Sequence, residues 1–566
     1  MVERELNARR LRLIKTGTQS PAQGRWHRTP AAAAFLISFA ALLLLHAPLL
    51  GLPYFWDEAG YYIPAAHDLY SSGAVIPFSI PANPHPPLVA ASLALAWKLG
   101  GFHPATTRVC MLLWAALALA GLYRLALRVS NQQVAIATLA LTALYPVFFS
   151  QSVLAHLDMA AAALTLWGLD AYVAYVAASA ASAEPQTPGL GPWLRYCAFF
   201  TLATLAKETA IVAPLALFVW ELAALDLRRW PRLAPLMPPR PARLWQPLLL
   251  LLPAAPLAAW LAYLYSRTGH LLGDDSFVHY NLTATLSPVR FVFALLQRMW
   301  QVAGHMNLYV LAAATVLAMF FPALPELGRG VLVMPEQPPE RERIALATQA
   351  AFAVVIVAYL CTLSLVGGAL LTRYLLPVVP LVILICVSTL RRRVTMWPYA
   401  AAVVALGFVI ALFVNPLYRF APEDNLAWTD YVRMHQHADE VIEARYAQAR
   451  VLTAWPASDE LTRTYLGYVR HPLPVVRIEN FTAEQIATAA ARSDFEVALL
   501  FSTKYEPPGG SPLDGVAWWR QLQQRYFDYH HDLPPQLAAA VLGARVVYME
   551  SRGGQWVAIA EREGRR

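Results

Sequence analysis

The stretch that decides the fold is AAAAFLISFAALLLLHAPLLGLPYFWDEAGYY (residues 31–62). Its first part, residues 31–50, is apolar and has the length of about 20 residues that a helix needs to cross a bilayer. Asp57 and Glu58 follow directly, among aromatic side chains. Acidic side chains are costly at the edge of a membrane, so their presence here indicates a function.

The composition extends this pattern to the whole chain. Of the 566 residues, 58% are hydrophobic and only 14% are charged, and the mean hydropathy is +0.43. Soluble domains have about 25% charged residues, so we expect a polytopic α-helical membrane protein. No small-residue cleavage site follows the first apolar run, which is therefore expected to stay as an uncleaved span. Ten more spans are expected, which makes about 11 in all: 106–127, 132–150, 157–179, 193–206, 208–226, 245–265, 301–323, 344–366, 369–390 and 396–414.

The distribution of Lys and Arg orients these spans. With the N-terminus in the cytoplasm, cytoplasmic segments hold 21 of these residues before residue 416 and the opposite side holds 7. This positive-inside bias requires that the short apolar stretch 86–101 be an interfacial, juxtamembrane helix. Loops 51–105 and 266–300 and everything after residue 415 then lie outside the cytoplasm, as in a multi-pass protein of the inner (plasma) membrane. The basic residues that give the net charge of +8 lie where they orient the spans. They form no basic patch rich in aromatic residues, so we expect no nucleic-acid partner.

The sequence pattern changes near residue 416, where long apolar runs give way to shorter ones. Residues 1–415 form the expected transmembrane domain, and residues 416–566 have the size of one extracytoplasmic domain. Four short runs rich in β-branched residues are typical of strands: 449–455, 495–502, 544–551 and 555–562. Helical patterns near 482–492 and 515–529 make this a small α/β domain, with RGG as the turn of a terminal hairpin. We expect it to serve as a scaffold or to recognise an acceptor.

The acidic pair is the first candidate site. Trp56, Tyr61 and Tyr62 surround Asp57 and Glu58 beside the lipid headgroups. A partly desolvated carboxylate is a good proton acceptor, which favours a general base. In the alternative interpretation, the aromatic residues form an interfacial belt and the acids cap a helix.

Two further polar motifs fall on the same side of the membrane. NPHPPL (83–88) places His85 at a rigid proline turn, where it could donate to a phosphate or a sugar hydroxyl. LAHLDM (154–159) places His156 and Asp158 at the outer end of a predicted helix. These two are i, i+2 and do not share a helix face, so no metal pair is expected. A turn residue and a helix cap are the structural alternatives for His85 and Asp158.

Cations accompany these acids. AKETA (206–210) puts Lys207 at a helix break, where it could also simply extend toward the interface. LLTRYLLPVVP (370–380) puts Arg373 and Tyr374 at the outer start of a later helix. Arginine grips phosphate with two parallel hydrogen bonds. Carboxylates for proton removal and cations for phosphate on one membrane face indicate group transfer from a lipid-anchored phosphate.

In these motifs the sequence resembles the C-superfamily glycosyltransferases that use polyprenyl-phosphate sugars. It is most similar to the protein O-mannosyltransferases and to the bacterial transferases that add aminoarabinose to lipid A. An acidic DE before tyrosines, a (K/H)PPL motif and an RYLLPVxP segment carry this resemblance over about 31–415. It implies a GT-C-type fold, a polyprenyl-phosphate-linked sugar donor and an acceptor outside the cytoplasm.

The resemblance also implies roles for single residues. Asp57 is then the general base of an inverting transfer, Glu58 supports the geometry or binds the acceptor, and Asp158 is a second acid. Lys207 and Arg373, with His85, Tyr374 and Tyr61, bind the donor phosphate and the substrate. The lipid A transferases usually have lysine where this chain has His85, and KET replaces the more familiar KGP at 207–209. Both departures argue against aminoarabinose as the sugar. No cofactor is required, and a divalent metal beside the acidic pair stays open.

Two other functions use similar residues. A ligase that transfers a whole lipid-linked oligosaccharide would need nearly the same site. A transporter of lipid-linked sugars would instead favour midplane sites in broken helices and internal pseudo-repeats. The sequence shows no such repeat, and its polar residues gather on one face, which favours the glycosyltransferase.

Overall fold

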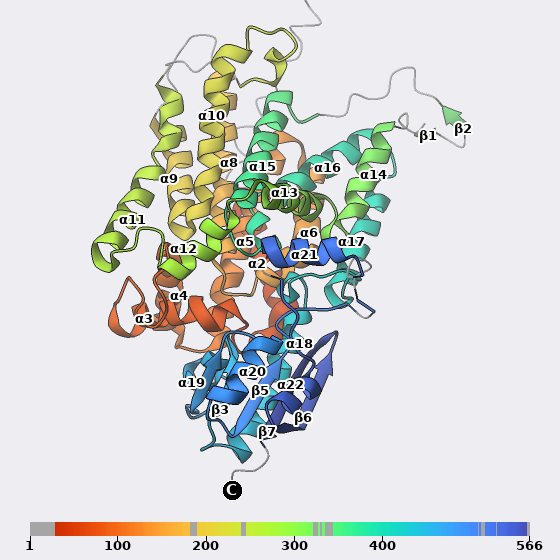
Figure 1. Ribbon diagram of the computed structural model, residues 1–566. Coiled ribbons are helices and arrows are strands. Elements are labelled where there is room, and N and C mark those ends of the chain that lie inside the picture. Colours follow the sequence, from red (N-terminus) through yellow and green to blue (C-terminus); the bar gives the residue numbers. More distant parts are fainter. Residues whose placement is uncertain are drawn as a thin grey trace, which may run out of the picture.

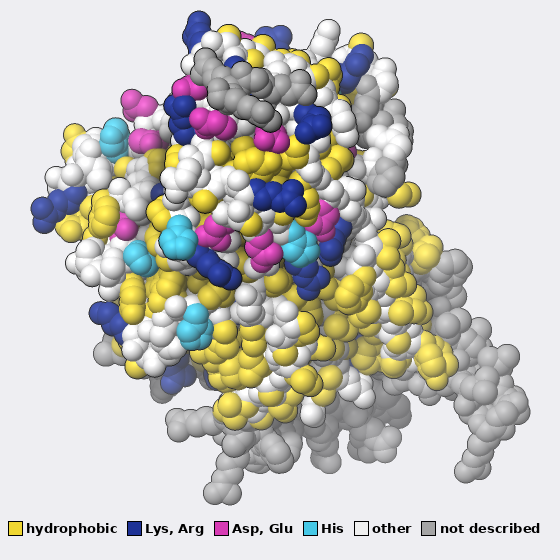
Figure 2. Space-filling model, turned by 90° about the horizontal axis from the view of Figure 1, so that it is seen from below, with side chains coloured by type: hydrophobic (Ala, Val, Ile, Leu, Met, Phe, Trp, Pro, Cys, Tyr) yellow, Lys and Arg dark blue, Asp and Glu magenta, His cyan; other side chains and the backbone are white. Residues whose placement is uncertain are grey.

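The computed structural model describes residues 29–181, 190–238, 245–320, 326–328, 331–333, 343–507, 509–510, 515–527 and 529–562. Helices from the first two thirds of the chain stand side by side, and a small sheet with its own helices caps one end of them (Figure 1). Seen from that end, charged side chains cover the cap and hydrophobic side chains gather beside it (Figure 2). The molecule is thus a helical membrane protein with a C-terminal α/β domain, as predicted.

Seven helical segments within the described residues are long and apolar enough to cross a membrane: Ala31–Leu49, Pro104–Val129, Leu157–Ser179, Glu208–Leu227, Gln246–Thr268, Pro288–Phe320 and Leu346–Leu365. They contain α2 (Thr29–His46), α5 (Pro104–Val129), α8 (Leu157–Ala181), α10 (Val212–Leu227), α11 (Ala254–Thr268), α13 (Pro288–Ala303), α14 (Leu308–Phe320) and α15 (Leu346–Leu365). The shorter α6 (Gln132–Leu144), α9 (Leu190–Ala206), α16 (Val379–Arg393) and α17 (Trp397–Phe413) lie among them. The predicted total of about 11 spans stays a prediction.

Three predicted spans are interrupted. The run 132–150 divides into α6 and α7 (Pro146–Gln151), because a residue before proline avoids the helical conformation and Tyr145 is extended (ψ 123°). The run 301–323 begins inside α13, which ends at Ala303, and continues as α14 from Leu308 after a break at Met306 (φ 49°). In the run 369–390, α16 starts at Val379 and is preceded by the short helix η9 (Thr372–Leu375). These regions are therefore not single regular spans, contrary to the prediction.

The segment between α2 and α5 holds two α-helices, α3 (Ile63–Ser72) and α4 (Leu88–Gly100). Both lie across the direction of α5 and α8 at the end that carries the sheet domain (Figure 1). With 13 residues, α4 is too short to cross a bilayer. The structure agrees with the juxtamembrane helix predicted at 86–101.

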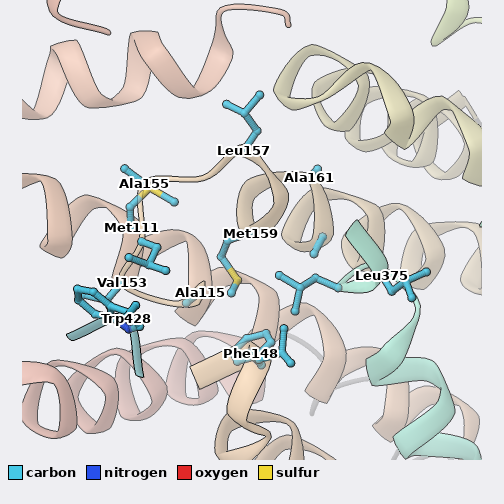
Figure 3. Packing of buried hydrophobic residues seen from close by; sticks show 14 of the residues in the cluster. Met111, Ala115, Phe148, Val153, Ala155, Leu157, Met159, Ala161, Leu375 and Trp428 are labelled. Atoms are coloured by element: carbon cyan, nitrogen blue, oxygen red, sulfur yellow. The ribbon is translucent and has the colours of Figure 1, made fainter. Parts of the chain in front are cut away.

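Close packing of small residues fixes the centre of the helical part. Met111 and Ala115 of α5 face Met159 of α8 in a buried cluster that Leu375 and Trp428 also enter (Figure 3). Alanine-rich helices approach one another closely, which strengthens dispersion contacts in a membrane. The cluster includes Ala155, Leu157 and Leu375, which stand next to or near the polar residues described below in the sequence.

The C-terminal domain is built on one five-stranded sheet in the order β4-β3-β5-β7-β6. Its strands are β3 (Val451–Ala454), β4 (Val475–Ile478), β5 (Val497–Phe501), β6 (Ala544–Arg552) and β7 (Gln555–Arg562). β4, β3 and β5 are parallel, and β7 and β6 add antiparallel strands. Helices α18 (Ala427–Arg445), α19 (Ala457–Thr462), α20 (Ala483–Arg492), α21 (Ala517–Phe527) and α22 (Pro535–Val541) belong to the same part of the chain.

The sequence predicted four of these five strands. It missed β4, a four-residue edge strand whose side chains are only partly buried, so no alternating apolar pattern marks it. The hairpin turn is confirmed, with positive φ at Gly553 (52°) and Gly554 (84°), a conformation that favours glycine. The domain boundary at residues 415 and 416 stays a prediction.

Candidate functional site

Asp57 stands at an irregular point of the chain. Trp56 before it has a positive φ of 44°, and a single π-helical turn, Glu58–Tyr62, follows it. Left-handed non-glycine residues and π-turns are both uncommon and concentrate at functional sites. The Asp57 carboxylate reaches Nη2 of Arg373 and keeps 19% of its side chain exposed.

Arg373 is the centre of the site. Its buried guanidinium contacts Asp57, donates from Nη1 to Oε2 of Glu423 at 2.5 Å, and lies 3.4 Å (Nε) from Oδ2 of Asp158. Nη1 also lies 3.4 Å from Nε2 of His156. The short helix η9 presents Arg373 to these side chains, which come from three other segments of the chain.

His156 is a neutral member of the cluster. Burial and the nearby cations Arg373 and Lys207 lower its pKa well below the usual range. Its Nδ1–H donates to Oε1 of Gln151 at 2.7 Å, which leaves Nε2 as the acceptor toward Arg373. His156 precedes α8 and Asp158 lies in its first turn, so both reach Arg373 although they are i, i+2.

Lys207 closes the other side of Asp158. Helix α9 ends at Ala206, and the extended backbone of Lys207 (φ −155°, ψ 130°) directs the side chain inward. Its Nζ lies 2.6 Å from Oδ1 of Asp158 and 3.9 Å from the ring centre of Tyr374. A carboxylate in the first turn of α8 is further stabilised by the helix dipole.

Glu423 is a site residue that the sequence analysis missed. It lies in the short helix η10 (Pro422–Asp424), behind α17. Burial raises its pKa to about 8, against the opposing influence of Arg373. The neighbouring Asp424 accepts from Thr372 at 2.9 Å and pairs with His305 at 2.9 Å, so η10 holds the whole Arg373 segment. The only signal in the sequence was the acidic pair just outside the last predicted span.

Arg298 is a second missed residue. It is buried in α13, donates from Nη1 to the carbonyl of Leu371 at 2.6 Å, and lies 5.7 Å from the ring centre of Tyr374. Its Nε and Nη2 have no hydrogen-bond partner among the described residues. Since Arg373 lies 5.4 Å from the same ring, three cations converge on Tyr374. In the sequence Arg298 resembled any basic residue of an amphipathic helix.

Glu58 points away from this cluster. It forms a fully buried ion pair with Arg108 and accepts from the backbone N–H of Phe55 (2.9 Å) and Ala155 (2.5 Å). Of the two roles expected for Glu58, this arrangement favours support of the geometry. Asp57 and Glu58 face different arginines, so they do not converge on one metal. Among the described residues, no group of three or more His, Cys, Asp or Glu side chains is placed to hold a metal ion.

His85 and Tyr61 lie at the margin of the site. His85 Nδ1 is 2.9 Å from Oε2 of Glu208, so the acid of the KET motif and the histidine of the proline turn form a pair. The ring of Tyr62 lies between His85 (6.0 Å) and His156 (5.5 Å) and links this pair to the Arg373 cluster. Tyr61 faces the C-terminal domain, 5.3 Å from Trp455.

An apolar groove lies between two of the long helices. Its volume is about 710 Å³, and α10 and α15 form its walls. Ile211 and Val212, four and five residues after Lys207, line one wall, and Val357, Ala358 and Cys361 line the other. Because Lys207 precedes Ile211 by only four residues, the groove lies near one of the cations, an arrangement that suits an amphiphile with an anionic head.

Comparisons with known proteins find a family match over part of the chain and solved structures with a similar fold. Residues 84–237 match the family described as dolichyl-phosphate-mannose-protein mannosyltransferase. ArnT from Cupriavidus metallidurans in the apo state is 16% identical over 94% of this chain and 98% of that chain (TM-score 0.51). ArnT bound to undecaprenyl phosphate is 15% identical over 93% and 98% (TM-score 0.51). Archaeal oligosaccharyltransferase AglB from Archaeoglobus fulgidus, in complex with an inhibitory peptide and a dolichol-phosphate, aligns less well (12% identity, 95% and 74%, TM-score 0.43). No curated protein sequence matches.

Proposed function

We propose that this chain is a membrane glycosyltransferase of the GT-C superfamily that uses polyprenyl-phosphate-linked sugars, a proposal that the partial family match and the similar fold of ArnT support. It moves one sugar from a polyprenyl-phosphate donor to an acceptor outside the cytoplasm, with inversion at the anomeric carbon. The observation that carries the proposal is the cluster in which Arg373 holds Asp57 beside two further cations.

The donor phosphate binds among the cations around Tyr374. Arg298 supplies two unused donor nitrogens, and Arg373 and Lys207 supply the remaining positive charge. The isoprenoid chain extends into the groove between α10 and α15. Burial of its apolar surface contributes about 25 cal/mol per Å², so the chain adds affinity without touching the chemistry.

Asp57 removes the proton from the acceptor hydroxyl. In the absence of a donor its carboxylate is bound to Arg373. An arriving phosphate competes for that guanidinium and loosens Asp57, so the base becomes available only when the donor is bound. Because of this coupling, transfer takes place only when the donor and the acceptor are both bound.

The bond changes follow from these roles. The acceptor oxygen forms a bond to the anomeric carbon, the bond from that carbon to the phosphate oxygen breaks, and the electron pair leaves with polyprenyl phosphate. The acceptor proton passes to the Asp57 carboxylate. The leaving phosphate gains negative charge, which Arg373, Lys207 and Arg298 stabilise in a site that excludes much of the water.

The proposal also assigns the site to one side of the membrane. Residues 1–415 form the membrane domain with a cytoplasmic N-terminus in the inner (plasma) membrane, and residues 416–566 form an extracytoplasmic domain. The Lys and Arg distribution supports this orientation. The site then opens on the outer face, where lipids, glycans and proteins can serve as acceptors.

The first test is Asp57→Asn in the full chain. We expect transfer to fall at least about 100-fold, because general base catalysis contributes about that much, while polyprenyl phosphate still binds. Asp275→Asn removes an exposed acid from the short helix α12 (Asp275–Asn281) and is the matched control, with transfer unchanged. Near wild-type transfer by Asp57→Asn would overturn the base assignment.

A further inference from the structure

The C-terminal domain touches the catalytic loop at a characteristic place in its sheet. β3 connects to β4 on one side, while β5 pairs with β3 on the other side, so the direction of the connections reverses between β3 and β5. In open α/β sheets this reversal opens a crevice at the carboxyl ends of the strands, where ligands bind. In this chain the position is taken by Trp56 of the first outer loop.

Aromatic side chains of the domain surround Trp56. Its ring centre lies 5.7 Å from Trp455, which directly follows β3, and 6.2 Å from Phe501, the last residue of β5. Tyr431 of α18 lies 5.5 Å away. All three contacts are edge-on, the geometry in which aromatic pairs attract beyond simple burial, by about 0.5–1.5 kcal/mol each.

Trp56 needs such support because its backbone is strained. A positive φ in a bulky residue costs about 1–3 kcal/mol and persists only where the surroundings enforce it. Asp57 is the next residue, so the conformation of Trp56 sets the direction of the carboxylate.

The domain also contacts the other side of Asp57. A Cβ at Gly60, in the π-turn, would overlap the ring of Trp455. The neighbouring Tyr61 lies 5.3 Å from Trp455. One side chain of the C-terminal domain therefore contacts both Trp56 and the turn that follows Asp57.

The aromatic surroundings are themselves held rigidly. The ring of His435 stacks on Tyr431 at 3.8 Å and pairs with Glu460 at 2.7 Å. Tyr468 donates to the backbone carbonyl of Tyr54 at 3.0 Å, a second link between the domain and the loop. Side chains held by such hydrogen bonds position a functional group more accurately than a free loop does.

We propose that the C-terminal domain positions the catalytic base: Trp455, Phe501 and Tyr431 hold Trp56 in its left-handed conformation and thereby direct Asp57 toward Arg373 and the acceptor. This inference rests on the proposed role of Asp57. Trp56 and Trp455 are positioning residues, since neither takes part in the bond changes. The domain is thus a working part of the active site in addition to any contact it makes with an acceptor.

Trp455→Ala in the full chain tests the proposal. A shift of the base by about 1 Å costs on the order of 100-fold in rate, so we expect kcat to fall about 10- to 100-fold while the donor KM changes less than about twofold. Trp455→Phe restores most of the rate because it keeps an aromatic edge. Phe495→Leu destabilises the same domain at the opposite end of β5, far from Phe501, and leaves kcat unchanged. An equal loss in Phe495→Leu, or a loss confined to KM, would overturn the proposal.

A double substitution tests the contact itself. Gly60→Ala alone lowers kcat because the added methyl group displaces Trp455. In the Trp455→Ala background the space is free, and Gly60→Ala causes little further loss. Additive losses would contradict the contact as the cause.

The base assignment and this inference fail in different ways. If Asp57→Asn loses transfer while Trp455→Ala does not, the positioning role is wrong and the base assignment stands. If Asp57→Asn keeps transfer, the base assignment is wrong whatever Trp455→Ala does. If both are right, Trp455→Ala adds little to the loss caused by Asp57→Asn, because the positioned group is already absent.

Discussion

At the scale of single residues, the site is a balance of buried charges around Arg373. The carboxyl groups of Asp57, Asp158 and Glu423 face the cations Arg373 and Lys207. Buried charges persist only when they are paired, and removing one partner leaves the other uncompensated. A bound anionic donor adds negative charge to this cluster. One of the carboxyl groups must then move away from Arg373 or be neutral.

Glu423 is suited to this role because it can lose its negative charge by binding a proton. With a pKa of about 8 it is mostly neutral at pH 7 and becomes a carboxylate as the pH rises through 8. The carboxylate competes with the donor phosphate for Arg373. We therefore expect the donor KM to rise severalfold between pH 7 and pH 9 in the wild type, and to stay flat in Glu423→Gln.

The measurement is the pH profile of the donor KM for both proteins in the same detergent. Glu423→Gln keeps the shape of the side chain, so a change in the slope of the profile reports the charge. Parallel profiles would show that Glu423 plays no part in the pH dependence.

At the scale of elements, the site residues lie where helices break. Lys207 falls between α9 and the following short helix, Arg373 lies in η9, and Asp57 precedes a π-turn. A break lets a side chain leave the regular helical pattern and turn toward the site, whereas Arg298 reaches the site from within α13. The apolar runs predicted the helices because hydrophobicity is a local property of the sequence.

The partners across the site could not be predicted in the same way. The pairing of Arg373 with Glu423 and the approach of Arg298 to Tyr374 depend on how distant helices pack. Asp57, Asp158, Lys207 and Arg373 were recognisable because a charge beside an apolar run is unusual in itself. Glu423 and Arg298 lie in segments where charges are ordinary, and only the folded structure reveals their burial.

Helix α18 carries another buried acidic residue, Asp439, whose burial destabilises the folded state. Both carboxylate oxygens of Asp439 lack a hydrogen-bond partner among the described residues. Burial, and then the charge of Glu460, raise its pKa well above the usual value. The folded state must therefore take up a proton that the unfolded state releases above about pH 4, so Asp439 destabilises the fold at neutral pH.

Asp439→Asn removes this cost. We expect it to increase the free energy of unfolding of the C-terminal domain at pH 7 by about 1–3 kcal/mol. The gain should shrink as the pH falls toward 4, where the unfolded state also binds the proton. Thermal unfolding of the full chain at several pH values measures the difference, and a gain independent of pH would contradict the account.

At the scale of the whole molecule, three parts meet at one site. The helical part supplies Arg373, Lys207 and the apolar groove, the first outer loop supplies Asp57, and the C-terminal domain encloses Trp56. Contacts between segments far apart in the chain couple these parts, so a substitution in the sheet domain is expected to act on chemistry at the membrane surface. Under the proposed function, this arrangement gives a role to a domain in which the sequence shows no catalytic motif.

The most direct measurement of the central claim is the thermal stability of the full chain titrated with polyprenyl phosphate and with the corresponding polyprenol. A ligand that binds only the folded state at 100 times its Kd stabilises it by about 2.7 kcal/mol. We predict that the phosphate raises Tm in the wild type, that the alcohol does so far less, and that Arg298→Ala removes the difference. Equal shifts for the phosphate and the alcohol, or an unchanged response in Arg298→Ala, would contradict a phosphate site around Tyr374.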